Sequence, residues 1–221
     1  MSDRSAKIGK LPTIRRLPGY LHLLRLLQEE GQPVVSGTYL AAQLKLDAVQ
    51  VRKDLSSTGI VGKPRVGFSV PGLITAIEEF LGWNNSSEAI LVGVGNLGSA
   101  LLGYSGFTRH QLDVVAAFDA DPRKVGQEIA GKPIFPMAKL ANLVQRLHIR
   151  ICILTVPASA AQQVAELLVA AEISAIWNFT SVVLRVPAGI IVQNEDLASG
   201  LAVLSRRLRQ PDGPVATRKM G

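Results

Sequence analysis

Cysteine and aromatic residues are scarce in this sequence: one Cys stands among 221 residues, and Phe, Trp and Tyr make up 5%. A single thiol cannot form an intrachain disulfide, which fits a reducing compartment. No apolar run is long enough to span a bilayer, and residues 1–10 lack an apolar signal core. We therefore expect a cytoplasmic protein without a membrane partner. Because 48% of the residues are hydrophobic, global disorder is excluded.

The sequence is also poor in groups for catalysis. None of its three His residues, His22, His110 and His148, follows the carboxyl end of an expected sheet strand, where the acid or base of a nucleotide-dependent enzyme belongs. His and Cys residues with metal-ligand spacing are absent, as is a nucleophilic Ser elbow. Cys152 lies in an apolar run and is expected to pack rather than react. We therefore expect a protein that is not an enzyme.

Positive charge is concentrated in the first third of the chain. Residues 1–70 hold eleven Lys and Arg against five Asp and Glu, whereas residues 71–221 hold thirteen against twelve. A clustered positive charge is typical of a polyanion-binding module, because displacing counterions from phosphates drives association. A solvated basic surface is the alternative interpretation.

Helical signals divide this basic segment into three helices, expected over residues 13–30, 38–45 and 48–57. The first has Leu at helical spacing, and Ser36 and Asp47 are good N-caps for the other two. A helix, a short turn and a second helix form the arrangement that places a recognition helix in the major groove.

The third helix and the segment after it supply candidate DNA contacts. Val51 and Leu55 are expected to face the core, which leaves polar side chains on the exposed arc. Two β-prone runs then flank a Gly-Lys-Pro-Arg turn, which predicts a winged-helix hairpin with a basic tip. The predicted DNA-binding residues are Gln50, Arg52, Lys53, Ser56, Ser57, Lys63 and Arg65. A three-helix protein-interaction module is the alternative.

The remainder of the chain alternates strands with helices, which predicts an α/β fold with a Rossmann-like doubly wound parallel sheet. Strands are expected at 88–93, 113–118, 133–135, 149–155, 174–178 and 190–193, and helices at 71–80, 96–104, 122–129, 136–147 and 158–171. We place a winged-helix domain at 1–82, a dinucleotide-binding domain at 83–193, a C-terminal helix at 194–210 and a disordered tail at 211–221.

A complete G-x-G-x-x-G motif follows the first strand of this second part. Gly93 allows a tight turn, Gly95 lets the backbone approach a pyrophosphate, and Gly98 lets helix and strand pack closely. Asp119, twenty-one residues past Gly98, is expected to accept hydrogen bonds from ribose hydroxyls and to favour NAD over NADP. The loop residues Val94, Asn96 and Leu97 complete the predicted site. FAD or a coenzyme A group remains an alternative ligand, and a small NAD-dependent oxidoreductase with an accessory basic domain remains the alternative function.

A leucine stripe marks the last expected helix. Leu197, Leu201, Leu204 and Leu208 share one helical face after the sheet is complete. This face either covers its own domain or packs on a second subunit, and two-fold symmetry would suit a palindromic DNA site.

Several segments together resemble the Rex family of redox-sensing transcriptional repressors, over roughly residues 10–210. The segments are Gln50–Ser56, Gly93–Gly98, Phe118–Pro122, Thr155–Pro157 with Ala161 and Gln162, and Trp177–Phe179. The resemblance implies a homodimer that binds a palindromic DNA operator when free or NAD⁺-bound and releases it when NADH binds. It adds Thr155, Val156, Pro157, Asn178 and Phe179 to the expected NAD(H) contacts and implies a domain-swapped C-terminal helix.

The resemblance also implies a switch. Asp196 matches the acid that begins the swapped helix, and Arg16 and Tyr104 match its exchange partners, so each contact would belong to one of two states. Leu197 stands where family members often carry Phe near the nicotinamide, Glu172 replaces a common Gly, and Thr180 and Ser181 replace an Ala-Pro pair. We expect Val94, Val156, Phe179 and Leu197 to form an apolar pocket that prefers the neutral reduced ring.

Overall fold

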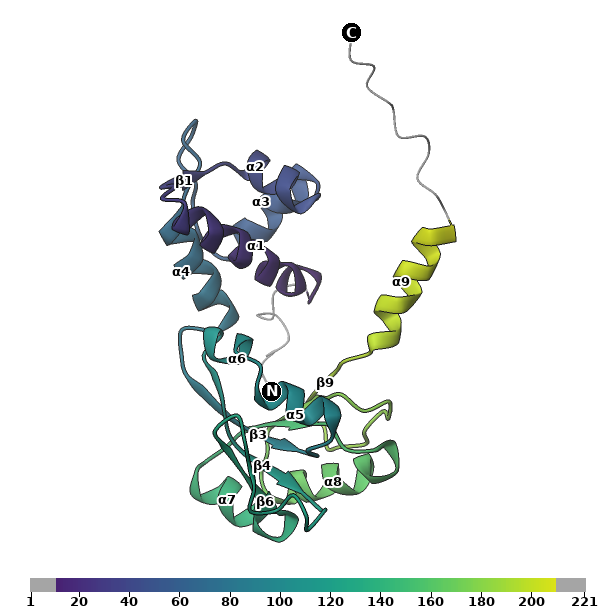
Figure 1. Cartoon of the computed structure of the whole chain (residues 1–221). Coiled ribbons are helices and arrows are strands. Elements are labelled where there is room, and N and C mark those ends of the chain that lie inside the picture. Colours follow the sequence, from purple (N-terminus) through teal and green to yellow (C-terminus); the bar gives the residue numbers. More distant parts are fainter. Residues whose placement is uncertain (1–10, 210–221) are drawn as a thin grey trace. The chain divides into compact units, whose positions relative to one another are not determined.

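The computed structural model describes residues 11–209, apart from the side chain of Leu197. The chain divides into two compact units, unit 1 at Met1–Ser86 and unit 2 at Ser87–Gly221 (Figure 1). The division falls after Ser86, four residues beyond the boundary placed from sequence. The tail expected to be disordered, 211–221, lies outside the described residues.

Unit 1 is a helical bundle with a small two-stranded sheet. Its elements are α1 (Leu11–Glu29), β1 (Val34–Val35), α2 (Gly37–Leu44), α3 (Ala48–Ser57), β2 (Phe68–Ser69) and α4 (Val70–Leu81). The two expected caps are present: the Ser36 hydroxyl accepts from the N–H of Tyr39 at 3.0 Å, and Asp47 Oδ1 accepts from the N–H of Val49 at 2.7 Å. Each cap satisfies a backbone donor that the first helical turn leaves unpaired.

The core of unit 1 comes from one face of each helix. It includes Leu17, Leu21 and Leu24 of α1, with Val51 and Leu55 of α3, and all five side chains are at most 1% exposed. The spacing of these residues is the one that placed the helices from sequence. The polar arc of α3 is therefore directed outward, which fixes the surface that this unit presents.

The hairpin after α3 is smaller than the sequence indicated. Only a single bridge between Lys63 and Gly67 closes its tip, and β2 pairs antiparallel with β1 instead of with the run before the turn. Arg65 occupies the left-handed region at a φ of 63° in this tight turn. The basic tip is present, but the first of the two expected strands is not.

Unit 2 contains a seven-stranded sheet in the order β5-β6-β4-β3-β7-β8-β9. The strands are β3 (Ser87–Val92), β4 (Leu112–Asp119), β5 (Glu128–Ile129), β6 (Lys132–Pro136), β7 (Ile151–Leu154), β8 (Ala175–Asn178) and β9 (Ile191–Asn194). All neighbours are parallel except β5 and β6. Without β5, the order in chain sequence is 3-2-1-4-5-6, the doubly wound order of dinucleotide-binding domains.

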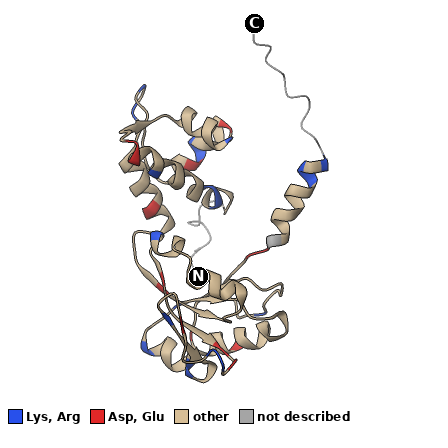
Figure 2. Ribbon diagram, viewed as in Figure 1, with Lys and Arg blue, Asp and Glu red and all other residues tan. Residues whose placement is uncertain are grey.

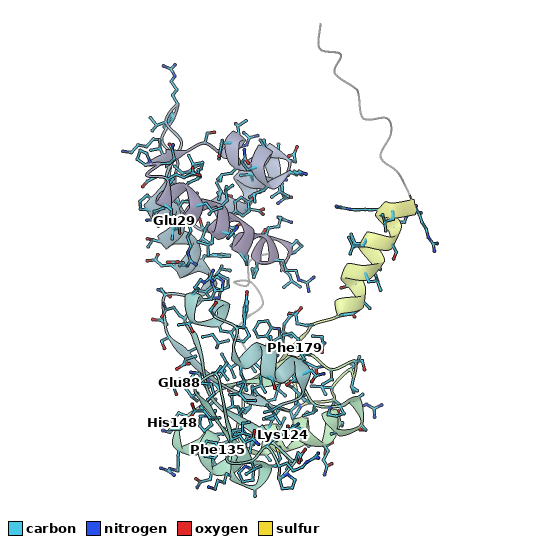
Figure 3. All side chains as sticks on the ribbon, in the orientation of Figure 1. Glu29, Glu88, Lys124, Phe135, His148 and Phe179 are labelled. Carbon is cyan, nitrogen blue, oxygen red and sulfur yellow. The ribbon has the colours of Figure 1, made fainter. Side chains whose placement is uncertain are left out.

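Helices and side chains cover both faces of this sheet (Figure 3). The helical elements are α5 (Asn96–Leu102), α6 (Gly106–Arg109), η2 (Met137–Lys139), α7 (Leu140–Arg146), α8 (Ala158–Ala170) and α9 (Leu197–Arg209). Successive residues of β3 alternate between two cores: Ile90 packs with side chains from α7 and α8, whereas Leu91 packs with side chains from α5 and α6. This alternation follows from the two-residue period of a strand.

One expected helix of unit 2 is absent, and one short helix was not expected. Residues 122–129 do not form a helix, because after one turn Gly126 adopts a left-handed φ of 84° and the chain enters the β5–β6 hairpin. The Asp121-Pro122 pair resembles a helix start and misled the sequence interpretation. The four-residue helix α6 was also not expected, since it is too short to show periodicity.

Candidate functional site: a glycine loop and a DNA-reading helix

The glycine loop lies where the strand order of the sheet reverses, between the carboxyl ends of β3 and β7. In open parallel sheets this reversal leaves a crevice for ligands. Gly93 adopts a φ of 99°, and a Cβ there would lie 2.8 Å from the backbone of Thr155 and Val156. A Cβ on Gly98 would overlap the carbonyl oxygen of Gly93. Only glycine fits at either position.

Gly95 is constrained differently from the other two glycines. Its φ is −84°, and a Cβ built on it would meet no protein atom within 4 Å. The fold itself therefore does not require glycine at this point. The open space instead fits the close approach of a pyrophosphate to the backbone, which is the role that the sequence pattern assigned to Gly95.

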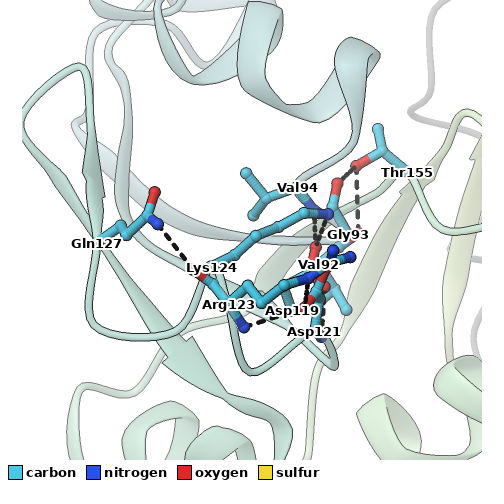
Figure 4. A network of polar contacts seen from close by, with 9 residues as sticks. All are labelled: Val92, Gly93, Val94, Asp119, Asp121, Arg123, Lys124, Gln127 and Thr155. Carbon is cyan, nitrogen blue, oxygen red and sulfur yellow. Dashed lines mark hydrogen bonds and ion pairs between the residues drawn. The ribbon is translucent and has the colours of Figure 1, made fainter.

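Thr155 at the end of β7 holds the loop from the other side. Its hydroxyl donates to the carbonyl oxygen of Gly93 at 2.7 Å, and its backbone N–H donates to the carbonyl oxygen of Val92 at 2.9 Å (Figure 4). Thr155 was expected to contact the cofactor. Its observed contacts fix the shape of the loop. Of the two residues that follow it, Val156 is half-buried and Pro157 is exposed.

Asp119 ends β4 at the position expected from sequence, but its hydrogen bonds are to the protein. Its Oδ2 accepts from the N–H of Val94 at 2.7 Å and from Lys124 Nζ at 3.0 Å, and its Oδ1 accepts from the N–H of Asp121 at 2.8 Å (Figure 4). Only 9% of the residue is exposed. The carboxylate therefore anchors the glycine loop, in addition to its expected role as an acceptor for ribose hydroxyls.

The charge of Asp119 is stabilised by these donors. Burial acts to raise the pKa of the carboxyl, but the N–H of Asp121, the Lys124 ammonium and the N–H of Val94 together bring the pKa below its usual range. Lys124 was not identified from sequence. It lies five residues beyond Asp119, in the turn that replaces the expected helix, so no periodic pattern marked it.

Asp121 forms an exposed ion pair with Arg123 at 2.8 Å. Its hydrogen bond with Arg123 lowers the pKa of its carboxyl to about 2. Asp121 also contributes its backbone N–H to Asp119, so this turn supports the loop anchor.

Aromatic rings connect the expected nicotinamide side of the site to Tyr104. Phe179 packs on Trp177 with centroids 5.2 Å apart, Trp177 packs on Phe107 at 5.7 Å, and Phe107 meets Tyr104 edge-on at 5.1 Å. A Cβ on Gly106 would overlap the Tyr104 ring. Tyr104 is 56% exposed, so the continuous series of rings begins at the half-buried Phe179 and ends at the surface.

Other expected cofactor contacts lie in varied environments. Asn96 and Leu97 are exposed at the start of α5, whereas Val94 is 2% exposed. Asn178 is fully buried: its amide donates to Val182 and Asn194 and accepts from Thr180. In this arrangement Asn178 shapes the loop after β8 and offers no free polar atom.

The structure directs the predicted DNA-binding side chains of unit 1 outward. Arg52, Lys53, Ser56 and Ser57 of α3 are exposed, as are Lys63 and Arg65 of the hairpin. Basic residues occur on α3 and at the hairpin tip (Figure 2). Gln50 is half-buried, because its side chain turns toward Asp54.

Asp54, buried beneath this surface, is the residue that sequence reasoning missed. It lies on α3 with no exposure and accepts from Arg16 Nε and Nη2, both at 2.7 Å. Thr13, Tyr20 and Gln50 donate to the same carboxylate at 2.9, 3.1 and 2.9 Å. The only signal in the sequence was a lone acid among the basic and polar residues of the predicted recognition helix.

The expected switch residues are distributed over both units. Arg16 of unit 1 binds Asp54, and Asp196 of unit 2 accepts from the N–H of Ala198 at 2.9 Å at the start of α9. Leu197 begins α9, but its side chain lies outside the described residues. Leu201, Leu204 and Leu208 are 64, 61 and 84% exposed, so no described residue covers the leucine stripe.

Residues 11–209 contain no group of three or more His, Cys, Asp and Glu that could hold a metal ion. None of their helices is long and apolar enough to cross a membrane.

Comparison with known proteins identifies matches for both units. Residues 11–56 match a family described as putative DNA-binding protein N-terminus, and residues 84–182 match the CoA binding domain family. A redox-sensing transcriptional repressor Rex of Treponema denticola is 51% identical over 198 residues, covering 90% of this chain and 94% of the relative. The Rex of Bacteroides fragilis is 45% identical, covering 89% of this chain and 90% of the relative.

Solved structures agree with these relatives. The crystal structure of RSP in complex with β-NAD⁺ and operator DNA matches with a TM-score of 0.85 at 33% identity, covering 91% of this chain and 93% of RSP. The structure of RSP with β-NADH matches with a TM-score of 0.83 at 32% identity, covering 91% and 95%. RSP is described as a Rex-family repressor.

Proposed function

The chain belongs to the Rex family of redox-sensing transcriptional repressors, and from this premise we propose that unit 1 reads a palindromic operator while the glycine loop of unit 2 binds NAD(H) and controls release. The open space at Gly95, beside two glycines that the fold requires, is the observation that carries the proposal. The loop binds a signal, and loss of DNA is the output. The structures of RSP with β-NAD⁺ and operator DNA and with β-NADH support the pairing of an operator-binding unit with an NAD(H) site.

The chain's own residues fit a dinucleotide. Gly93 and Gly98 keep the loop tight, and Gly95 leaves space for phosphates. Asp119 and Thr155 hold the loop backbone from the ends of β4 and β7, the strands on either side of β3. When bound, NAD⁺ presents a positive nicotinamide ring and NADH a neutral one. The apolar side chains of Val94, Val156, Phe179 and Leu197 would favour the neutral ring, because an apolar pocket disfavours an unpaired charge.

DNA recognition falls to the exposed arc of α3 and to the hairpin tip. Arg52 can bind guanine with two hydrogen bonds, and Lys53 and the hydroxyls of Ser56 and Ser57 can bind phosphates. The basic tip, Lys63 and Arg65, suits a groove or the backbone. The excess of positive charge in residues 1–70 supports this assignment.

The switch would exchange the partner of Asp196. We assign one state to an Asp196–Arg16 contact and the other to an Asp196–Tyr104 contact. Arg16 is already oriented by Asp54, which binds its Nε and Nη2. Tyr104 is connected to Phe179 through Phe107 and Trp177, so a change at the nicotinamide end has a packed route to the switch.

Dimerisation would cover the exposed stripe of α9. Leu201, Leu204 and Leu208, which no described residue covers, are costly to expose to water, and a second copy supplies a matching surface. A symmetric dimer matches the two half-sites of a palindrome. We further propose that the protein acts in the cytoplasm and regulates without catalysis, since a basic DNA-reading unit accompanies the nucleotide domain in place of a substrate domain.

The testing experiment is a gel shift with a palindromic promoter fragment and the full-length protein, with NADH, with NAD⁺ or with neither. We expect a complex with NAD⁺ and without nucleotide, and its loss with NADH. A complex that NADH leaves intact would overturn the proposed sensing. Lys53→Ala should weaken binding to every DNA sequence and reduce the slope of the logarithm of the association constant against the logarithm of the salt concentration by about one. Turnover of NADH with a small carbonyl compound would instead support the oxidoreductase alternative.

A further inference from the structure

The carboxylate of Asp54 is surrounded only by donors. Five N–H and O–H groups from Thr13, Arg16, Tyr20 and Gln50 reach its two oxygens at 2.7 to 3.1 Å, and the residue has no exposure. A buried carboxylate is tolerated only when such partners replace its water. Five hydrogen bonds to one side chain, on the helix proposed to face DNA, indicate a role beyond packing.

The five donors come from two helices. Thr13, Arg16 and Tyr20 lie three and four residues apart, on one face of α1. Gln50 precedes Asp54 by one helical turn on α3. Asp54 therefore fixes α1 against α3 and, at the same time, holds the side chain of Gln50 at the edge of the exposed arc.

The protonation state of Asp54 decides how the Gln50 amide is oriented. Burial acts to raise the pKa of Asp54, but the hydrogen bonds from Arg16, Thr13, Gln50 and Tyr20 lower it below its usual range, so the group is ionised at neutral pH. An ionised carboxylate only accepts hydrogen bonds. The Gln50 nitrogen, not its oxygen, must therefore face Asp54, in agreement with the 2.9 Å contact from Nε2 to Oδ1.

This orientation leaves a defined edge on Gln50 for a base. One Nε2 proton is bound by Asp54, and the second proton and Oε1 remain; among residues 11–209 no donor is hydrogen-bonded to Oε1. Adenine presents N7 as an acceptor and its N6 amino group as a donor in the major groove. A fixed amide matches that pair in one order only, and a flipped amide would place acceptor against acceptor.

We propose that Asp54 is a specificity-determining positioning residue, which fixes the Gln50 amide so that α3 selects adenine at one position of each operator half-site. The inference rests on the proposed DNA-binding function. It differs from a phosphate contact, because loss of Asp54 would relax the preference at one base pair and leave the remaining preferences unchanged. A bidentate contact favours the correct base over a wrong base by a factor of about 5 to 150 in affinity, and loss of Asp54 would reduce this factor.

The test measures full-length variants against a set of operator fragments, each with one symmetric base-pair change, by competition without nucleotide. Asp54→Asn keeps the size of the side chain but adds a donor that can bind Gln50 Oε1 and permit the flipped amide. Asp47→Asn is the matched control: it changes the other carboxylate of α3, which contacts no Gln50 side-chain atom, and Asn is an equally good N-cap. Gln50→Ala identifies the base pair that Gln50 reads.

We expect Gln50→Ala to lose discrimination at one symmetric position and Asp54→Asn to lose at least about fivefold at that same position. The double variant should lose no more than Gln50→Ala, since both changes act through one amide. Asp47→Asn should match the wild type. NADH affinity, measured in parallel, reports that unit 2 is intact in every variant.

Two results would overturn the inference: Asp54→Asn weakening all fragments equally with base preferences intact, or Gln50→Ala changing no preference. Wild-type protein that binds no palindromic fragment would instead overturn the proposed function, and the inference with it. If Asp54→Asn does not fold, NMR of the wild type decides. One Gln50 side-chain amide proton must be protected from exchange, and rapid exchange of both protons would refute the contact.

Discussion

Replacing Gly95 with Ala should separate the sensor from the repressor. The substitution adds a single methyl group where the glycine loop faces open space, with no protein atom within 4 Å of the new Cβ. The backbone there has a φ of −84° and a ψ of −166°, which Ala adopts without strain. The methyl group would occupy the space that a pyrophosphate needs.

The expected effect of Gly95→Ala on folding is much smaller than its expected effect on NADH binding. For folding, Ala gains about 0.4–1 kcal/mol over Gly through the unfolded chain, but it is a poorer N-cap for α5 by a similar amount. Unfolding free energy should therefore change by less than about 1 kcal/mol. For binding, overpacking costs about 1–3 kcal/mol, which raises the Kd for NADH by about 5- to 150-fold.

Titration calorimetry with NADH and thermal denaturation measure the two quantities, with two glycine variants as references. Gly98→Ala should lose both stability and binding, because its Cβ would overlap the Gly93 carbonyl oxygen. Gly103→Ala should lose neither, since its nearest neighbour lies 3.8 Å away and its φ is −86°. In the gel shift, Gly95→Ala should still bind the operator but require a correspondingly higher NADH concentration for release. Wild-type NADH affinity in Gly95→Ala would refute the placement of the pyrophosphate.

Three further predictions concern other parts of the chain. Leu204→Glu should raise the dimer Kd at least about tenfold by placing a charge in the leucine stripe, whereas Arg206→Glu on the opposite face should not; light scattering across a dilution series checks this, and an unchanged Leu204→Glu dimer would exclude α9 from the interface. Asp54 has a lowered folded pKa, so its stabilising contribution is complete above the unfolded value of about 3.9 and is lost as the pH falls through the folded pKa; denaturation between pH 3 and 7 should show a steeper acid loss for the wild type than for Asp54→Asn. Gly106→Ala should displace the Tyr104 ring. It should change the NADH concentration needed for DNA release without weakening operator binding when NADH is absent, and an unchanged NADH concentration would argue against Tyr104 as a switch partner.

Features encoded by local spacing could be predicted from sequence. The caps Ser36 and Asp47 placed α2 and α3, and the spacing of Gly93, Gly95 and Gly98 placed the loop. Each depends on residues within one or two turns of one another. The doubly wound order then follows from the alternation of strands and helices.

Features that depend on distant partners could not be predicted. No local pattern marks Asp54 as buried, because its burial depends on Thr13, Arg16 and Tyr20, 34 to 41 residues earlier. Asp119 was placed correctly, but its bond to the N–H of Val94, 25 residues away, depends on how two strands align. Short-range patterns carry no information about either contact.

The single sulfhydryl has a practical consequence for measuring motion. Cys152 lies in β7 with no exposure, and burial raises the pKa of its thiol. Maleimide and thiosulfonate reagents should therefore not react with it in the folded state. The natural sequence is therefore already a silent background for site-directed labelling. Cysteines introduced at the exposed positions Gln43 in unit 1 and Gln145 in unit 2 could carry a pair of spin labels. The distance distribution between them, recorded with NAD⁺ and with NADH, would report movement between the units directly. The same burial protects the one thiol from oxidants, so we expect the protein to register redox state through a bound electron carrier and not through oxidation of this cysteine.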